Sequence, residues 1–269
     1  MIMDQTFSLH ESNRTASTAT LIEFITTAIG AANVEQKPFQ HLELRNIFPA
    51  NLYAALLDAM PDPSNYRSMN GRSRNNDLAD GTHTRVKIDL FPECIRHLST
   101  EKRLIWSIVG AALRSDEVKD AFRRSLAQAL EKRFGRDHAS VGLYAVPILT
   151  RDFPGYRIKP HTDTHWKGIT VQLYLPRDTT NSDIGTIFHR VLPRNALLNA
   201  KQMPFVPNSG YAFAVSDDTW HSAEQVHDRV KTRDSILLTY FVDRNPVQRL
   251  SNRGKRLGNF LLNGFRNRT

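Results

Sequence analysis

The sequence is poor in cysteine and has no long apolar run. Cys94 is the only cysteine among 269 residues, so no disulfide can form within the chain, and such usage is typical of a reducing compartment. The longest apolar stretch, Leu104 to Leu113, is too short to span a bilayer. The polar start, Met1 to Arg14, lacks the apolar core of a signal peptide. We therefore expect a cytoplasmic protein with no membrane partner.

Acidic residues are the minority among the charged ones. Lys and Arg number 36 against 27 Asp and Glu, which gives a net charge of +9. A basic surface attracts anions, but the basic residues are scattered except in the tail from Arg244 to Arg268, and no nucleic-acid recognition motif is present. The charge favours a soluble surface with a positive bias, and an anionic small molecule as a partner, over a nucleic acid.

The hydrophobic share of 40% is enough for a sizeable core, and the length suits one domain, residues 1–269. Within it we expect a flexible tail over 1–15, mainly helical support over 16–139, a β-rich core over 140–243 and a basic C-terminal extension over 244–269 that forms a docking helix. Apolar residues at helical spacing predict helices over 17–34, 51–60, 100–113 and 116–134, and alternation predicts a strand over 39–48.

Short β-rich runs separated by turn-forming residues fill the second half. They cover 141–149, 156–158, 169–175, 186–192, 211–215 and 235–242. Such a series predicts a barrel or jelly roll, so the fold class is α+β, with the helices packed on one face. The polar stretch 64–84 has no apolar period, and it is either a surface loop or an active-site lid.

Three residues of the β-rich half have the composition of a metal site. His161 and Asp163 are one residue apart, and extended backbone places such residues on the same face. His221 follows 58 positions later, as expected for a ligand from a distant strand. Two imidazoles and one carboxylate form the facial triad of mononuclear non-haem iron(II), which leaves open coordination positions.

Arg233 lies twelve residues after His221 and begins an apolar strand. Alternation places Arg233, Ser235 and Leu237 on one face of that strand. An arginine inside a barrel is costly unless an anion pairs with it. A carboxylate of a cosubstrate suits the guanidinium fork, and Ser235 can add a hydroxyl donor. The alternative is an arginine at the solvent-facing end of the strand.

The stretch 153–163, Phe-Pro-Gly-Tyr-Arg-Ile-Lys-Pro-His-Thr-Asp, resembles the metal-site strand of the iron(II)/2-oxoglutarate-dependent oxygenases, in the prolyl-hydroxylase-like branch. That family combines His-x-Asp, a distal His and a basic residue ten to twelve positions further on. Residues 39–63 also resemble the opening of that branch. The likeness covers roughly residues 140–243, and the helical part is less specific.

The resemblance implies a double-stranded β-helix, a jelly-roll or cupin-like barrel, with flanking N-terminal helices. It implies that His161, Asp163 and His221 bind Fe(2+), and that Arg233 and Ser235 bind the distal carboxylate of 2-oxoglutarate. Tyr144 is a further candidate contact for this cosubstrate. The reaction would consume O2, with ascorbate as a stimulant. An intact carboxylate at Asp163 favours hydroxylation over halogenation, because halogenating relatives carry a small residue there.

His165 offers a different ligand set. If the strand continued past Asp163, His161, Asp163 and His165 would all point to one face, and an all-local site could form. The position of Trp220-His221 relative to Arg233 favours His221. Four residues are then candidates for the substrate pocket: Arg157, His165, Trp166 and Gln172. His189 is expected on the surface.

The sequence as a whole predicts an iron(II)- and 2-oxoglutarate-dependent dioxygenase that hydroxylates an unactivated C–H bond of a small, anionic metabolite. Three alternatives remain: a peptide or protein side-chain hydroxylase of the same superfamily, a non-catalytic metal-binding cupin-like barrel, and a nucleic-acid oxygenase suggested only by the net charge. Failure to consume 2-oxoglutarate would favour the non-catalytic barrel. Salt-dependent binding to DNA or RNA would favour the nucleic-acid oxygenase.

Overall fold

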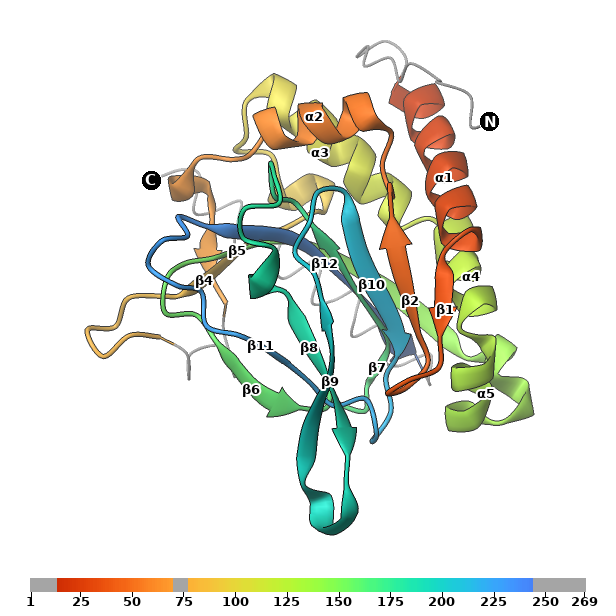
Figure 1. The fold of residues 1–269 in the computed structure, drawn as a ribbon. Helices are drawn as coiled ribbons and strands as arrows, with labels where there is room; N and C mark the ends of the chain where they lie inside the picture. The colour runs from red at the N-terminus through yellow and green to blue at the C-terminus, as the bar shows by residue number, and fades with distance from the viewer. Residues whose placement is uncertain (1–13, 70–76, 244–269) are drawn as a thin grey trace.

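The computed structural model describes residues 14–69 and 77–243, which form two antiparallel β-sheets with helices on one side (Figure 1). The larger sheet has eight strands in the order β1-β2-β10-β7-β12-β5-β4-β3, and the smaller has four in the order β6-β11-β8-β9. Neighbours in both orders are mostly distant in sequence. This is the strand arrangement of a jelly roll, so the predicted double-stranded β-helix is present as two facing sheets and not as a closed barrel.

The larger sheet is built around its two longest strands, β5 and β12, which pair along eleven residues each. Its strands are β1 (Asn33–Glu35), β2 (His41–Arg45), β3 (Arg67–Ser68), β4 (Arg85–Asp89), β5 (Gly142–Asp152), β7 (Lys167–Tyr174), β10 (Ser209–Ala214) and β12 (Arg233–Asp243). The smaller sheet consists of β6 (Ile158–His161), β8 (Thr186–Val191), β9 (Leu197–Met203) and β11 (His221–Ala223).

Within residues 14–69 and 77–243, five helices accompany the sheets. They are α1 (Arg14–Gly30), α2 (Ala50–Asp58), α3 (Thr100–Leu113), α4 (Asp116–Ser125) and α5 (Ala127–Phe134). Short 3-10 turns occur at η2 (Pro63–Asn65), η4 (Pro92–Cys94), η5 (Arg136–Ser140), η6 (Ser182–Ile184) and η7 (Pro193–Asn195). In α1, Leu21, Ile25 and Ile29 are buried at a spacing of four residues, which directs one face of the helix to the core.

Two apolar cores hold the layers together. The larger core lies between the five helices and the outer face of the eight-stranded sheet, and Trp106, Phe122 and Tyr240 are fully buried in it. The smaller one lies between the two sheets and is rich in aromatic rings, among them Phe188 and Phe213. The helices therefore support the larger sheet from outside and leave the space between the sheets for the candidate site.

The predicted helices agree with α1, α2 and α3, but 116–134 is two helices and not one. Helix α4 ends before Leu126, whose backbone (φ −108°, ψ 17°) leaves the helical region, and α5 starts directly afterwards. Leu126 and Leu130 are nonetheless both buried. The apolar period continues across the break, so hydrophobic spacing alone gives no sign of it.

The strands predicted over 140–243 are confirmed within a few residues, but β9 and β11 were missed, as were β1, β3 and β4 in the first half. The predicted strand at 156–158 starts later, at Ile158, and ends at His161. In the described part of the chain, no helix has the length and hydropathy needed to cross a membrane. The 1–15 tail (up to residue 13), the middle of the predicted lid (70–76) and the predicted docking helix (244–269) lie outside the described residues.

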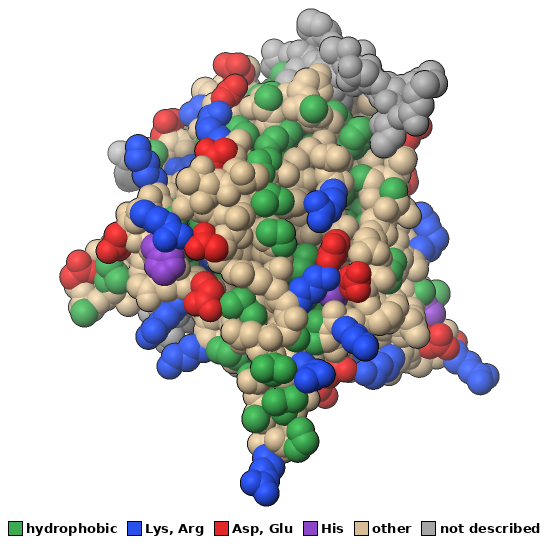
Figure 2. All heavy atoms as spheres, viewed as in Figure 1, with side chains coloured by type: hydrophobic (Ala, Val, Ile, Leu, Met, Phe, Trp, Pro, Cys, Tyr) green, Lys and Arg blue, Asp and Glu red, His purple; other side chains and the backbone are tan. Residues whose placement is uncertain are grey.

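The hairpin of β8 and β9 projects from the body of the molecule (Figures 1 and 2). Val191 and Leu198 on this hairpin are 40% and 44% exposed. On the face shown in Figure 2, Lys and Arg side chains are scattered and alternate with acidic ones. This face agrees with the expectation of dispersed basic residues.

Candidate metal and anion site

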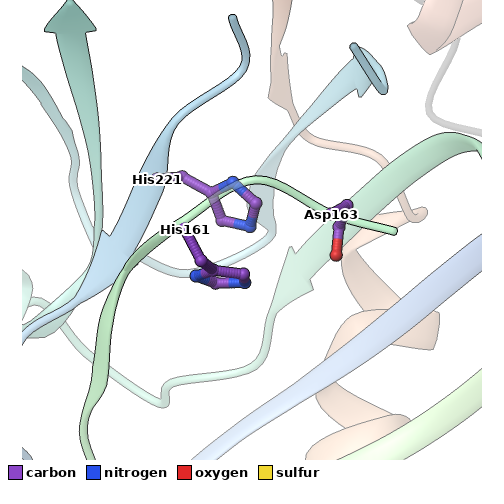
Figure 3. A group of neighbouring side chains, drawn as sticks. All are labelled: His161, Asp163 and His221. Carbon is purple, nitrogen blue, oxygen red and sulfur yellow. The ribbon is translucent and has the colours of Figure 1, made fainter. Parts of the chain in front are cut away.

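His161, Asp163 and His221 converge between the two sheets (Figure 3). Their candidate ligand atoms all lie within 4.8 Å of one another, and no other group of this kind is found among residues 14–69 and 77–243. His161 ends β6 and pairs directly with His221 at the start of β11, which brings the two ring centroids to 4.3 Å. Asp163 follows two residues after the end of β6, so the local bend of the chain, not a continuing strand, positions its carboxylate.

Both imidazoles are held in the same way. Nδ1 of His161 donates to the carbonyl oxygen of Lys159 at 3.0 Å, and Nδ1 of His221 donates to that of Thr219 at 3.0 Å. A carbonyl only accepts, so each Nδ1 carries the proton and each Nε2 keeps its lone pair. This fixed tautomer is the arrangement commonly found for metal-binding histidines.

Burial keeps both imidazoles neutral. Desolvation lowers the pKa of His221 to about 4, although the Asp163 carboxylate acts in the opposite direction. Desolvation also lowers the pKa of His161, against the backbone carbonyl of Lys159. A neutral imidazole is the form that binds a metal ion. Both rings are therefore available as ligands at neutral pH.

Asp163 is ionised and fully engaged. Burial alone would raise its pKa, but the Lys167 ammonium and, in acid, the protonated His221 ring hold it at about 2. Lys167 Nζ donates to Oδ1 at 2.5 Å, and Thr170 Oγ1 donates to Oδ2 at 2.6 Å. Lys167 supplies one positive charge next to the carboxylate, and a bound divalent cation would add to it. Two neutral imidazoles and one carboxylate fit iron(II) or another first-row divalent ion.

A cavity of about 80 Å³ opens beside the triad and extends between the sheets. All three candidate ligands line it, as do Gln172 and Arg233. Since one water needs roughly 10–15 Å³ of such space, the cavity holds on the order of five to eight waters. That volume suits a small organic anion together with the open coordination positions of a metal.

At the other end of the cavity Arg233 is buried in an ion cluster. Its Nε and Nη2 donate to Asp152 Oδ2 at 3.0 and 2.9 Å, and its Nη1 donates to the carbonyl oxygen of Ile184 at 2.6 Å. Arg85 pairs with the same carboxylate through Nε and Nη2, the latter at 2.8 Å from Oδ2. Burial would raise the pKa of Asp152, but the two guanidiniums hold it below its ordinary value.

Three phenol groups line the wall between the two ends. Tyr174 donates to Thr186 Oγ1 at 3.1 Å, and Tyr211 and Thr186 share a hydrogen bond of 3.0 Å. The guanidinium carbon of Arg85 lies 4.1 Å from the ring centroid of Tyr156. Burial raises the pKa of all three tyrosines, so they stay protonated and can act as hydrogen-bond donors. Together with the arginines they place hydrogen-bond donors and positive charge around this end of the cavity.

The other predicted cosubstrate contacts lie at different depths. Ser235 is buried at 1% exposure, shares a hydrogen bond of 2.9 Å with Thr150 and accepts one from Gln172, whose side chain lines the cavity. Ser235 is therefore one layer behind the lining. Tyr144 is half-buried on β5 opposite Phe241 and is not among the residues that line the cavity.

The remaining predicted pocket residues are outside the cavity. Arg157 and His165 are exposed, and Trp166 is 50% exposed with its ring 4.9 Å from that of His165. The strand does not continue past His161, so the alternative all-local site with His165 does not form. The three residues lie on the surface near the chain segment that carries Asp163.

His189 is not on the surface as expected. It is 3% exposed on β8, and its Nε2 lies 2.8 Å from Ser222 Oγ, next to His221 in the chain. The prediction was wrong because β11 pairs with β8 and brings Ser222 against this side chain. No local pattern in the sequence indicates the three-residue strand β11.

Arg85 and Asp152 were missed as site residues. Arg85, Val86, Lys87 and Ile88 alternate between polar and apolar, which is a strand signal, but a basic residue in such a strand normally faces solvent. Asp152 ends a predicted strand, where a turn-forming acid is common. Only the pairing of β4, β5 and β12 places Asp152 between Arg85 and Arg233, the two residues of this row that line the cavity.

No protein-family model matches the sequence, and no curated protein matches it. Among solved structures, the chain is similar to a prolyl-4-hydroxylase from Pseudomonas putida, with a TM-score of 0.47, 13% identity, and coverage of 85% of this chain and 99% of that one. It is similar to a prolyl hydroxylase from Trichoplax adhaerens in complex with a peptide fragment of hypoxia inducible factor, with a TM-score of 0.46, 10% identity, and coverage of 86% and 94%. An oxidoreductase of the 2OG-Fe(II) oxygenase family from Burkholderia pseudomallei has a TM-score of 0.40, 14% identity, and coverage of 87% and 93%.

Proposed function

We propose that the protein is an iron(II)- and 2-oxoglutarate-dependent dioxygenase. The observation that supports this most is one cavity whose lining holds a His-Asp-His triad and a buried arginine cluster. A metal at the triad and an anion at the arginines would occupy the two ends of the same space. 2-Oxoglutarate matches this arrangement because it carries a metal-chelating 2-oxo acid at one end and a carboxylate at the other.

Each residue has a definite task in this proposal. Nε2 of His161, Nε2 of His221 and one oxygen of Asp163 would hold the iron, and Thr170 would keep the other oxygen of Asp163 in place. Arg233 would bind the distal carboxylate of the cosubstrate through its remaining N–H groups. When bound, iron(II) activates O2 for oxidation of a C–H bond, coupled to decarboxylation of the 2-oxo acid.

The position of the substrate follows from the size of the cavity. A cosubstrate of ten heavy atoms would take up the whole of this space, which holds on the order of five to eight waters. The carbon to be oxidised must then approach the triad from its rim. Arg157, just before the His161–Asp163 segment, and Trp166, just after it, are both exposed. An anionic small molecule with an apolar part suits this pair, and we propose its hydroxylation.

A peptide substrate is the second candidate. It is favoured by one observation: Trp166 is 50% exposed, and its ring packs against that of His165. These two rings form an open aromatic surface on which a side chain of a peptide could pack. Replacing Trp166 with Ala would weaken the binding of either kind of substrate, so this variant does not separate them. A panel of free acids and of peptides, screened for substrate-stimulated succinate formation, separates the two candidates.

Substrate-independent turnover tests the chemistry without a known substrate. The purified protein is supplied with iron(II), 2-oxoglutarate and O2, and succinate is measured over time for the wild type, His161→Ala, Asp163→Ala and His165→Ala. We expect slow succinate formation in the wild type and in His165→Ala, and only the buffer level in the two triad variants. Unchanged succinate formation in His161→Ala or Asp163→Ala would refute the triad.

A further inference from the structure

Three charged residues lie in one row across three neighbouring strands. Arg233 on β12 is the direct partner of Asp152 on β5, and Asp152 is in turn the partner of Arg85 on β4. Their side chains are 6%, 0% and 13% exposed, in that order. Both arginines line the cavity, whereas the carboxylate between them is closed off from solvent. The row therefore presents two guanidiniums to the cavity and hides their shared counterion.

The hydrogen bonds leave donors free on both arginines. Arg85 uses Nε and Nη2 on Asp152, and its Nη1 has no hydrogen-bond partner among the described residues. Arg233 uses Nε and Nη2 on the same carboxylate and Nη1 on the Ile184 carbonyl. A guanidinium carries five N–H groups. Arg85 thus keeps more unused donors than Arg233, the residue that the sequence pattern had singled out.

The charges of the row do not cancel. Two guanidiniums face one carboxylate, and both lie near the ring of Tyr156, at 4.1 Å for Arg85 and 5.3 Å for Arg233. A buried excess of one positive charge is costly unless an anion balances it. One ligand carboxylate would supply that anion and accept hydrogen bonds from both arginines.

We propose that Arg85 is a second binding residue for the distal carboxylate of the cosubstrate, and that Asp152 is the positioning residue that holds Arg85 and Arg233 at the same carboxylate. This inference rests on the proposed function. It assigns a ligand contact to the β4 strand of the N-terminal half, outside the β-rich segment that carries the triad. It also makes the site selective for cosubstrates that carry a second carboxylate.

The test is an anaerobic titration of the iron(II)-loaded protein with 2-oxoglutarate and, separately, with 2-oxopentanoate, which has the same chain without the distal carboxylate. Arg85→Gln is informative because it leaves Asp152 and Arg233 as a balanced pair, so the fold should persist. Arg85→Lys keeps the charge, and Arg67→Gln is the matched control on β3, where Arg67 pairs with Asp89. Thermal melts of each variant accompany the titrations.

We expect Arg85→Gln to weaken 2-oxoglutarate binding by about 10- to 100-fold, the value of a hydrogen bond between charged groups. Binding of 2-oxopentanoate should change by less than about 2-fold, Arg85→Lys should recover part of the loss, and Arg67→Gln should match the wild type. An unchanged Kd for 2-oxoglutarate in Arg85→Gln, or an equal loss for both ligands, would overturn the inference. If the wild type itself bound no 2-oxoglutarate, the proposed function would fail, and this inference with it.

A double variant separates direct contact from charge balance. In Arg85→Gln with Asp152→Asn, Arg233 alone faces the cavity, and the net charge of the row equals that of the wild type. If Arg85 donates to the ligand, the double variant stays about 10-fold or more weaker for 2-oxoglutarate. Recovery of wild-type affinity would mean that Arg85 serves only to offset Asp152, and would overturn its assignment as a binding residue.

Discussion

Replacing Asp152 with Asn should strongly destabilise the protein. The Asp152 side chain has no exposed surface, and its two partners Arg85 and Arg233 are 13% and 6% exposed. The substitution keeps the size of the side chain but leaves two adjacent guanidiniums in the interior without a counterion. Breaking a buried ion pair by removing one partner costs about 3–5 kcal/mol. We expect a loss of that size in the free energy of unfolding.

The assay is equilibrium unfolding in urea at pH 7, without metal, because urea carries no charge and does not screen the cluster. With a slope of about 3 kcal/mol per molar urea, the midpoint should fall by roughly 1–1.7 M. Asp58→Asn is the control, since Asp58 pairs with Arg177 on the surface, where the side chains are 75% and 65% exposed. That pair should contribute only about 0–1 kcal/mol.

The sign of the pH dependence adds a second check. The folded pKa of Asp152 is lowered, so its stabilisation is present above its unfolded pKa and disappears as the pH falls through the folded value. The difference between wild type and Asp152→Asn should therefore be full at pH 7 and shrink in strong acid. A loss below about 1 kcal/mol at pH 7, with an unchanged urea slope, would refute the shared-counterion account.

Three further predictions concern the metal side and the hairpin. In the metal-free chain, His221 has a folded pKa of about 4 against an ordinary 6.5, so its contribution of about 3 kcal/mol is full above pH 6.5 and is lost as the pH falls to 4. Urea midpoints should therefore rise with pH across this range, and His221→Gln should make the rise smaller, while the lowered pKa of His161 keeps part of it. Lys167→Met removes the ammonium that neutralises Asp163. It should tighten iron(II) binding by about 5- to 30-fold, which is the effect of one charge near a divalent ion in a partly hydrated site. An unchanged or higher Kd for iron(II) would show that Lys167 mainly orients the carboxylate. Gly185→Ala would place a Cβ 1.7 Å from the Met203 carbonyl oxygen and should cost at least about 1–3 kcal/mol, whereas Gly30→Ala, with open space around it, should not destabilise; equal stability of the two variants would contradict the close approach of β8 and β9.

The sequence predicted the parts of the fold that depend on local pattern. Burial of Leu21, Ile25 and Ile29 at helical spacing, and the long strands β5 and β12, follow directly from periodicity. The break at Leu126 and the short strand β11 do not, because neither changes the apolar pattern. These features depend on contacts with distant segments, which periodicity does not contain.

The candidate site was likewise predictable where it depends on local pattern, and not where it depends on contacts between distant strands. The spacing of His161, Asp163 and His221 predicted a metal site, with His165 left as an alternative ligand. The structure places the ligand atoms of His161, Asp163 and His221 within 4.8 Å of one another. Arg233 was expected to need an anion, but the anion that the structure supplies is Asp152, from a strand 81 residues earlier. Arg85 reaches the same carboxylate because β4 pairs with β5, and no local pattern in the sequence indicates that pairing.

The central claim is that one cavity holds iron(II) at the triad and 2-oxoglutarate at the arginines. It is tested most directly by anaerobic titration of the metal-free protein with iron(II) and then 2-oxoglutarate, while the weak visible metal-to-ligand charge-transfer band is followed in the wild type and in Arg233→Ala. We predict a band that saturates in the wild type and needs a much higher 2-oxoglutarate concentration in the variant. A wild-type protein that shows no band at saturating iron(II) and 2-oxoglutarate would contradict the claim.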